Sequence, residues 1–349
     1  MISLSRFLLL LVSATACRVM NPVPQPEPSS GFESVFPDEN ARKRFEELAP
    51  SVIRLTAYIN YRTIFFEPDS LVTLLEIKKD LALSFIRASI VRNESYSGTA
   101  TILSVKGNSA LLLSCAHNVS FPDTLFTYND KANMHGERYL LGLSVKTGQI
   151  LVLNGPVGVM QAKVLVADTE NDLALLEVEA VQVTSIPCCP VLKLAEVSSL
   201  NWGDRVWLAG YPSGRFMLTS GLLSIPEDTD GIILTDAPFS EGYSGAPALV
   251  YNLKAGEFLL AGVGRSVAAH SEYVIRPEKK IHEIAYNTAL PYEGPNYVEI
   301  EKQAAPGVTF IASSDIISGF LRSNRGVLEE NGWTNNLIPA SVHEMKEKD

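Results

Sequence analysis

TDAPFSEGYSGAP (235–247) holds Gly242, Tyr243, Ser244 and Gly245 between two apolar stretches typical of strands, GIIL (231–234) and ALV (248–250). Glycines flanking a serine let the backbone turn sharply, and amide N–H groups can then converge on one point. A serine on such a loop is a candidate nucleophile. The tetrapeptide alone is also compatible with a hairpin turn, so its interpretation depends on the rest of the chain.

Two upstream stretches supply the groups that a serine nucleophile needs. LLLSCAHNV (111–119) is an apolar strand that delivers His117 at its end, and DTENDLALLEV (168–178) places Asp172 just before another apolar strand. A serine hydroxyl is a poor nucleophile until a base takes its proton, and an acid must hold the tautomer of that base. His117, Asp172 and Ser244 therefore form a candidate catalytic triad.

Five motifs, in this order, resemble those of trypsin-like serine proteases, closest to the bacterial HtrA type. They are SGTATILS (97–104), SCAHNV (114–119), NDLALLEV (171–178), GDRVWLAGYPSG (203–214) and the 235–247 segment. The resemblance implies that His117 is the general base, Asp172 its orienting acid and Ser244 the nucleophile. It also implies that the amides of Gly242 and Ser244 form the oxyanion hole.

The chain departs from the family at three positions close to these motifs. The family usually carries Gly where Ala246 stands and often Asp or Asn where Tyr243 stands. Animal relatives often have Cys where Asn118 stands. None of these departures removes a catalytic group.

The resemblance also locates a substrate pocket. In trypsin-like proteases the residue six before the nucleophile lines the pocket floor, which here is Pro238. The wall is expected from the segment 260–264, and we assign to it Ala261, Gly262, Val263 and Gly264. These uncharged residues predict cleavage after small or medium apolar residues, because a buried, unpaired Lys or Arg would be costly. Asp236 could still turn into the pocket and reverse that preference.

Short apolar runs alternate with turn signals from Gly98 onward, and Pro187–Pro190 divides them into two sets. The first set is 99–105, 110–115, 139–145, 149–153, 161–167 and 173–178. The second is 205–209, 216–223, 231–235, 247–251, 257–263 and 272–275. Such spacing is typical of an all-β fold. With the resemblance, it predicts two six-stranded antiparallel β-barrels of the chymotrypsin-like type, with the catalytic cleft between them.

The N-terminus has the pattern of an exported protein. Residues 1–16 are expected to be a signal peptide, with Arg6, an apolar core (7–12) and a small-residue cleavage site (14–16). Cys17 then resembles the lipidated cysteine of bacterial lipoproteins, although ordinary cleavage would leave it free. Residues 17–31 are a Pro/Ser-rich tether. The expected location is the bacterial cell envelope, in the periplasm or at the outer membrane.

The other segments complete the predicted organisation. Residues 32–90 form an N-terminal extension packing on the first barrel, with helices at 38–48 and 71–86. The first barrel spans 91–190, with an insertion at 121–139, and the second spans 191–325 with a closing helix at 307–322. Residues 326–349 are a polar tail. Too little chain follows Arg322 for the PDZ module that HtrA-type proteins often carry, so none is expected.

Composition limits the partners. A formal net charge of −10 without a basic run argues against a nucleic-acid binder. Four cysteines without a C-x-x-C pair argue against zinc, and neither a metal nor a cofactor is expected. Cys115 is interpreted as a buried small hydrophobe, with a bridge to Cys188 or Cys189 left open. Expected partners are protein or peptide substrates and a membrane reached through Cys17.

These observations together predict an exported, membrane-tethered serine endopeptidase that works through an acyl-enzyme. One alternative is a protease-like fold used as a surface binding or adhesion module with weak or no catalysis, which the tether and the 121–139 insertion would suit. Another is an esterase using the same triad. The usual α/β scaffold of esterases needs strand–helix alternation, which this sequence does not have.

Overall fold

The computed structural model describes residues 34–67, 69–78, 86–132, 136–155, 158–179, 192–224, 230–277 and 296–333. The predicted signal peptide, Cys17 and the tether (17–31) lie outside these ranges. So do Cys188, Cys189, the Pro187–Pro190 boundary and the end of the predicted tail (334–349). None of the helices in the described part of the chain has the length and apolar character needed to span a bilayer.

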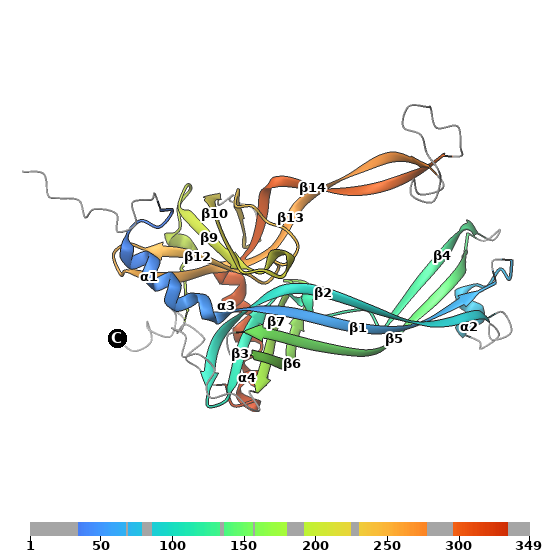
Figure 1. The fold of residues 1–349 in the computed structure, drawn as a ribbon, viewed down its shortest axis with the longest axis horizontal. Coiled ribbons are helices and arrows are strands. Elements are labelled where there is room, and N and C mark those ends of the chain that lie inside the picture. The colour runs from blue at the N-terminus through green and yellow to red at the C-terminus, as the bar shows by residue number, and fades with distance from the viewer. Residues whose placement is uncertain are drawn as a thin grey trace, which may run out of the picture. The chain divides into compact units, whose positions relative to one another are not determined.

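Six strands of the described chain close into a first barrel (Figure 1). In sheet order they are β1 (Val52–Phe66), β2 (Ile86–Lys106), β3 (Ser109–Ser114), β7 (Leu173–Glu179), β6 (Gly158–Asp168) and β5 (Arg138–Gly155). β5 pairs with β1 to complete the closure, and β4 (Thr124–Ala132) is added at the other edge of β5. The barrel core is built from inward-facing apolar residues such as Leu55, Leu112, Leu153 and Leu176, all buried.

A second barrel has the same plan. Its six strands, in sheet order, are β12 (Pro247–Asn252), β9 (Arg205–Gly210), β10 (Met217–Ser224), β11 (Ile232–Thr235), β14 (Asn296–Ser313) and β13 (Glu257–Pro277). β13 pairs with β12 to close the barrel, and the short β8 (Lys193–Leu194) runs parallel to β13. Val206, Leu208, Ile233, Ala248 and Ile311 are part of its buried core.

The predicted fold class is confirmed, but the strands are divided differently. The runs 139–145 and 149–153 belong to one strand, β5, because β1 pairs along both. The irregularity between the runs is one extra residue of β5, Thr147, opposite the step from Asn60 to Tyr61. The sixth strand of this barrel is β1, which lies within the predicted extension 32–90. Likewise 257–263 and 272–275 are both in β13, and β14 supplies the sixth strand of the second barrel.

The helices are few and short. α1 (Glu39–Leu48) agrees with the predicted helix, and its cap is Asp38, whose carboxylate accepts a 2.7 Å hydrogen bond from the amide of Ala41. α2 covers Leu74–Lys78 within the longer helix predicted at 71–86. α3 (Ser314–Ser323) begins seven residues after the predicted start at 307, because residues 307–313 are the end of β14, in which 309–313 pair with β11 and β13. α4 (Arg325–Glu330) follows. The 3₁₀ helices are η1 (Ala49–Ser51), η3 (Ala116–Asn118), η4 (Val197–Ser199) and η5 (Pro212–Gly214).

The two ends of the described chain are bound to opposite barrels. Helix α1 packs on the second barrel, where the Phe45 ring meets the Phe258 ring with centroids 6.2 Å apart and Asn40 donates to the Tyr251 hydroxyl. After α4, buried Trp333 donates to the Glu177 carboxylate on β7 of the first barrel at 3.0 Å. The segments before and after the barrels therefore link the two halves of the fold.

β13 and β14 continue beyond the barrel as a two-stranded ribbon (Figure 1). The side chains on its two faces differ in kind. The exposed apolar face consists of Tyr273, Ile275, Val298 and Ile300. On the other face Arg276 forms ion pairs with Glu299 and Glu301.

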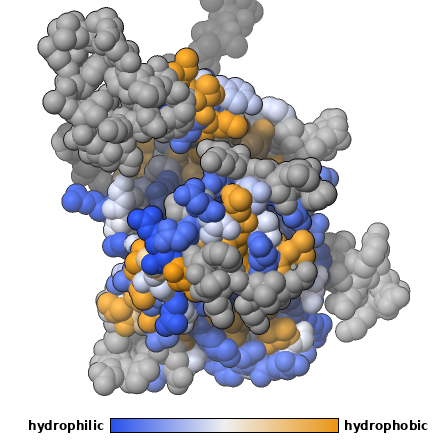
Figure 2. All heavy atoms as spheres, turned by 90° about the vertical axis from the view of Figure 1, so that its right-hand side faces the viewer, coloured by the Kyte–Doolittle hydropathy of each residue, from blue (hydrophilic) through white to orange (hydrophobic). Residues whose placement is uncertain are grey.

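Figure 2 views the molecule from the right-hand side of Figure 1. Among its coloured atoms, apolar side chains are interspersed with hydrophilic ones.

Candidate active site

Ser244 lies on a tight loop between β11 and β12 that requires glycine on both sides. Gly242 and Gly245 have φ values of +102° and +87°, which side chains with a Cβ rarely adopt. A Cβ on Gly242 would clash with the carbonyl oxygen of Tyr211, and one on Gly245 would clash with that of Thr99. The sequence pattern therefore reflects both backbone conformation and close packing between the barrels.

The first barrel holds this loop through hydrogen bonds. The carbonyl oxygen of Ser244 accepts from the amide of Thr99 at 2.8 Å and from Nδ2 of Asn118 at 2.9 Å. The Thr99 hydroxyl donates to the carbonyl oxygen of Gly242 at 2.7 Å. Thr99 and Asn118 are both buried, so these bonds are shielded from water. They place a loop of the second barrel against the first.

His117 and Asp172 come together from neighbouring strands of the first barrel. β3 ends just before η3, which contains His117, and Asp172 immediately precedes β7, the partner of β3. Nδ1 of His117 lies 2.7 Å from Oδ2 of Asp172, and the amide of His117 donates to Oδ1 at 3.0 Å. The Asp172 side chain is 12% exposed and that of His117 is 48% exposed. The acid is thus held beneath a ring that solvent or a ligand can reach.

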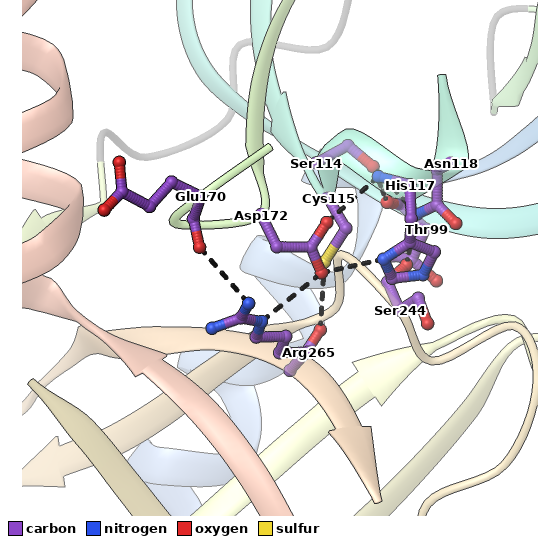
Figure 3. A network of polar contacts seen from close by, with 10 residues as sticks. Thr99, Ser114, Cys115, His117, Asn118, Glu170, Asp172, Ser244 and Arg265 are labelled. Carbon is purple, nitrogen blue, oxygen red and sulfur yellow. Dashed lines mark hydrogen bonds and ion pairs between the residues drawn. The ribbon is translucent and has the colours of Figure 1, made fainter. Parts of the chain in front are cut away.

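The three residues of the candidate triad line one pocket of about 590 Å³. Figure 3 places Ser244 next to the His117 ring, with Asp172 on the ring's other side. No hydrogen bond joins the described side chains of Ser244 and His117. Such bonds are often long in the absence of substrate and shorten when it binds.

The two amides assigned to the oxyanion hole differ from their neighbours. The amide of Tyr243 donates to Ser240, and those of Gly245 and Ala246 donate to Gly264 and Tyr243. Within the described residues, the amides of Gly242 and Ser244 have no such acceptor. They remain able to donate to a ligand oxygen.

The pocket is not lined by the residues predicted for its floor and wall. Besides the three residues of the candidate triad, its lining consists of Phe239, Ser240, Glu241, Arg265, Ser266 and Val267. Pro238 lines an adjoining cavity of about 430 Å³. Ala261 and Val263 are buried in the barrel, and Gly262 and Gly264 pair with β14. The part of β13 that lines this pocket is residues 265–267.

Three residues of the site had no role in the sequence prediction. Thr99 and Asn118 hold the nucleophile loop, and Arg265 contacts Asp172 with its Nε 3.6 Å from Oδ2. The first two lie within quoted motifs, so their position beside the site could have been inferred. Arg265 follows the last residue of the predicted wall, and nothing in the residue pattern indicates that its side chain points to Asp172.

Cys115 is a buried free thiol beneath this site, as the interpretation of a small hydrophobe requires. Its Sγ contacts the carbonyl oxygen of Gly264 at 3.4 Å. Burial, followed by the Asp172 charge, raises the pKa of this thiol well above its usual value. Donor atoms of Cys115, His117 and Asp172 lie within 4.8 Å of one another. The 2.7 Å hydrogen bond between the last two leaves no space for an ion between them, and a protonated thiol is a poor metal ligand.

Two closed six-stranded barrels, with a glycine-flanked serine of one facing a histidine–aspartate pair of the other, define a chymotrypsin-like fold. Residues 98–259 match the family described as Trypsin-like peptidase domain. The predicted resemblance to trypsin-like serine proteases is confirmed by this match.

Solved structures similar to the chain include two of the HtrA-type protease AlgW, one with a tripeptide and one with a decapeptide. Both are 16% identical to it, with TM-scores of 0.43 and 0.44, and they cover 81% and 82% of this chain. The alignments cover 62% and 66% of those chains, so this chain spans less than two thirds of their length. No curated protein matches the sequence.

Proposed function

We propose that the protein is a serine endopeptidase with Ser244 as nucleophile, His117 as general base and Asp172 as the acid that orients the base. The observation that carries the proposal is the 2.7 Å contact between Nδ1 of His117 and Oδ2 of Asp172, in the pocket that Ser244 also lines. The match to the trypsin-like peptidase domain supports the same assignment.

The histidine–aspartate contact sets the direction of proton transfer. When Nδ1 of His117 donates to Asp172, Nε2 carries the lone pair and can take the proton of Ser244. The serine oxygen then bonds to the peptide carbonyl carbon, and the carbonyl oxygen becomes an oxyanion. His117 returns the proton to the leaving amine, which gives an acyl-enzyme and a free amino terminus. Water attacks the acyl-enzyme with the same base and releases the second product.

The oxyanion is stabilised by the amides of Gly242 and Ser244 in this proposal. Both are without an acceptor in the described part of the chain, and the loop is already fixed by Thr99 and Asn118. Donors that do not have to reorganise as charge develops are worth about 3 kcal/mol each in comparable sites.

A fluorophosphonate probe that reacts with activated serines tests the assignment. Wild-type protein should be labelled at Ser244, as found by peptide mapping, and should cleave an unfolded protein substrate. Ser244→Ala should lose both properties, cleavage by about 10³-fold or more, because the members of a triad act as a unit.

Ser240→Ala is the matched control, since Ser240 lines the same pocket and has no catalytic role in the proposal. The Ser240→Ala variant should still be labelled by the probe at Ser244. Undiminished cleavage by Ser244→Ala would refute the assignment. Wild-type protein that is folded and stays unlabelled would favour the alternative of a binding module.

A further inference from the structure

Arg265 is the residue at a β-bulge in the wall of the pocket. On β13, Gly264 pairs with Ile311 and Ser266 pairs with Phe310, the next residue of β14. Arg265 is therefore an extra residue without a partner across the ladder. A bulge of this kind turns a side chain out of the regular alternation, and bulges are common beside active sites.

The bulge directs Arg265 toward the first barrel (Figure 3). Its Nε lies 3.6 Å from Oδ2 of Asp172, and its Nη2 donates to the carbonyl oxygen of Glu170 at 3.3 Å. Both partners belong to the turn between β6 and β7. One guanidinium thus joins the strand that forms the pocket wall to the turn that carries the acid.

The Asp172 turn benefits from such a support because its backbone is strained. Asp172 has φ of +56°, in the left-handed region that non-glycine residues seldom adopt. The preceding residues are fixed by Asp168, whose carboxylate accepts from the amides of Glu170 and Asn171. At Asp172 itself, His117 and Arg265 bind the carboxylate from different elements.

We propose that Arg265 is a positioning residue for Asp172, and that occupation of the pocket strengthens its hold. The side chain of Arg265 is 32% exposed, and water at an exposed ion pair weakens it. Because Arg265 also lines the pocket, a peptide bound there displaces that water and lowers the local dielectric constant. The histidine–aspartate pair is then most firmly oriented when substrate is present. The catalytic consequence rests on the proposed function, whereas the orientation of the pair does not.

The other role open to Arg265 is recognition of an acidic side chain of the substrate. Two of its nitrogens, however, already contact Glu170 and Asp172. A role in recognition would appear in the KM of substrates with Asp or Glu, and a positioning role would appear in kcat. The two roles can therefore be separated.

The direct test observes the hydrogen bond rather than turnover. The proton between Nδ1 of His117 and Asp172 gives a low-field NMR signal, whose exchange with water reports how firmly the pair is held. Arg265→Met, which keeps the length without the charge, should exchange this proton about tenfold faster. Arg265→Lys keeps the charge but loses the planar, forked guanidinium. In this variant the His117 proton should exchange about threefold faster than in wild type. Arg215→Met, an arginine lining the adjoining cavity, should exchange like wild type.

Kinetics supply the second readout. Arg265→Met should label with the fluorophosphonate about tenfold more slowly than wild type, with KM for peptides unchanged, and should add no further loss in an Asp172→Asn background. The proposal would be overturned if this proton exchanged at the wild-type rate in both the Met and the Lys variants. A change confined to the KM of acidic substrates would also overturn it. If the wild type is never labelled, the proposed function fails while proton exchange still decides the role of Arg265. If the Met variant does not fold, the Lys variant decides it.

Discussion

The carboxylate of Asp236 accepts a hydrogen bond from the amide of Leu222 on β10 at 2.6 Å. This bond keeps Asp236 out of the pocket that Ser244 lines, so the residue is not available to pair with a basic substrate side chain. The pocket instead offers the apolar side chains of Phe239 and Val267, with Glu241 exposed at its edge. An exposed carboxylate pairs only weakly, by about 0–1 kcal/mol.

Cleavage should therefore occur after small or medium apolar residues and be poor after Lys or Arg. Burying a lysine without a partner costs several kcal/mol, on the order of 10²-fold or more in kcat/KM. Profiling of a peptide library measures this preference. A dominant preference for Lys or Arg would contradict it, and Glu241→Gln would then identify or exclude Glu241 as the cause.

Cys115 should be chemically inert in the native protein although it lies two residues from His117. The raised pKa means that less thiolate is present at any pH below it, and only the thiolate reacts. At about pH 8, alkylation of Cys115 by iodoacetamide should be at least about 100-fold slower than in the unfolded chain. Mass spectrometry of the Cys115 peptide with and without denaturant measures the ratio. Equal rates in the two states would mean that the thiol is accessible.

At the scale of elements, the sequence was most informative where local pattern and tertiary environment agree. Asp38 before an amphipathic run predicted α1 to within one residue, because capping is a local interaction. Residues 307–313 were misassigned to a helix because they are apolar and lie next to α3. Their strand conformation depends on β11 and β13, whose partner residues are distant in the chain.

The same distinction applies to the site. His117, Asp172 and Ser244 could be selected because each stands in a short motif at the end of a strand. The stretch of β13 that lines the pocket of Ser244 is harder to locate, because it begins at the bulge on Arg265, and a bulge is defined by pairing with β14 rather than by local sequence. A count along the chain predicts the preceding residues, 261–264, instead.

Helix α1 should contribute to the stability of the second barrel through Phe45. Phe45 is 7% exposed and its ring packs edge-on against Phe258, so truncation leaves a cavity. Phe45→Ala should lower the free energy of unfolding by about 3 kcal/mol, as measured by denaturant titration. Lys43→Ala on the exposed side of the same helix is the control and should change it by less than about 0.5 kcal/mol. Equal effects of the two substitutions would show that the helix is not part of the fold's core.

At the scale of the whole molecule, we expect attachment to a membrane through Cys17, a residue outside the described part of the chain. The apolar run 7–12, the small residues 14–16 and the Pro/Ser-rich stretch after Cys17 are the basis. The mature chain should begin at Cys17 and carry more than one acyl chain, because a single chain binds a membrane only marginally. Mass spectrometry of the N-terminal peptide tests this. Cys17→Ser should release the protein from membranes, and an unmodified Cys17 or a different mature start would refute lipidation.

The two ends of the described chain pack on opposite barrels, and this bears on the lifetime of the folded protein. Asn40 and Tyr251 are 211 residues apart in sequence, and Lys106 and Gly332, which are also hydrogen-bonded, are 226 apart. Contacts at such separations form late in folding because long loops must close first, so folding should be slow. The packing of Phe45 on Phe258 and of Trp333 on β7 adds contacts that are lost when a barrel opens, so we expect unfolding to be slow as well. For a peptidase of the proposed kind, which meets other copies of itself, survival depends on how seldom its own backbone becomes an extended substrate. We expect the packing of these ends on the barrels to make such exposure of the backbone rare.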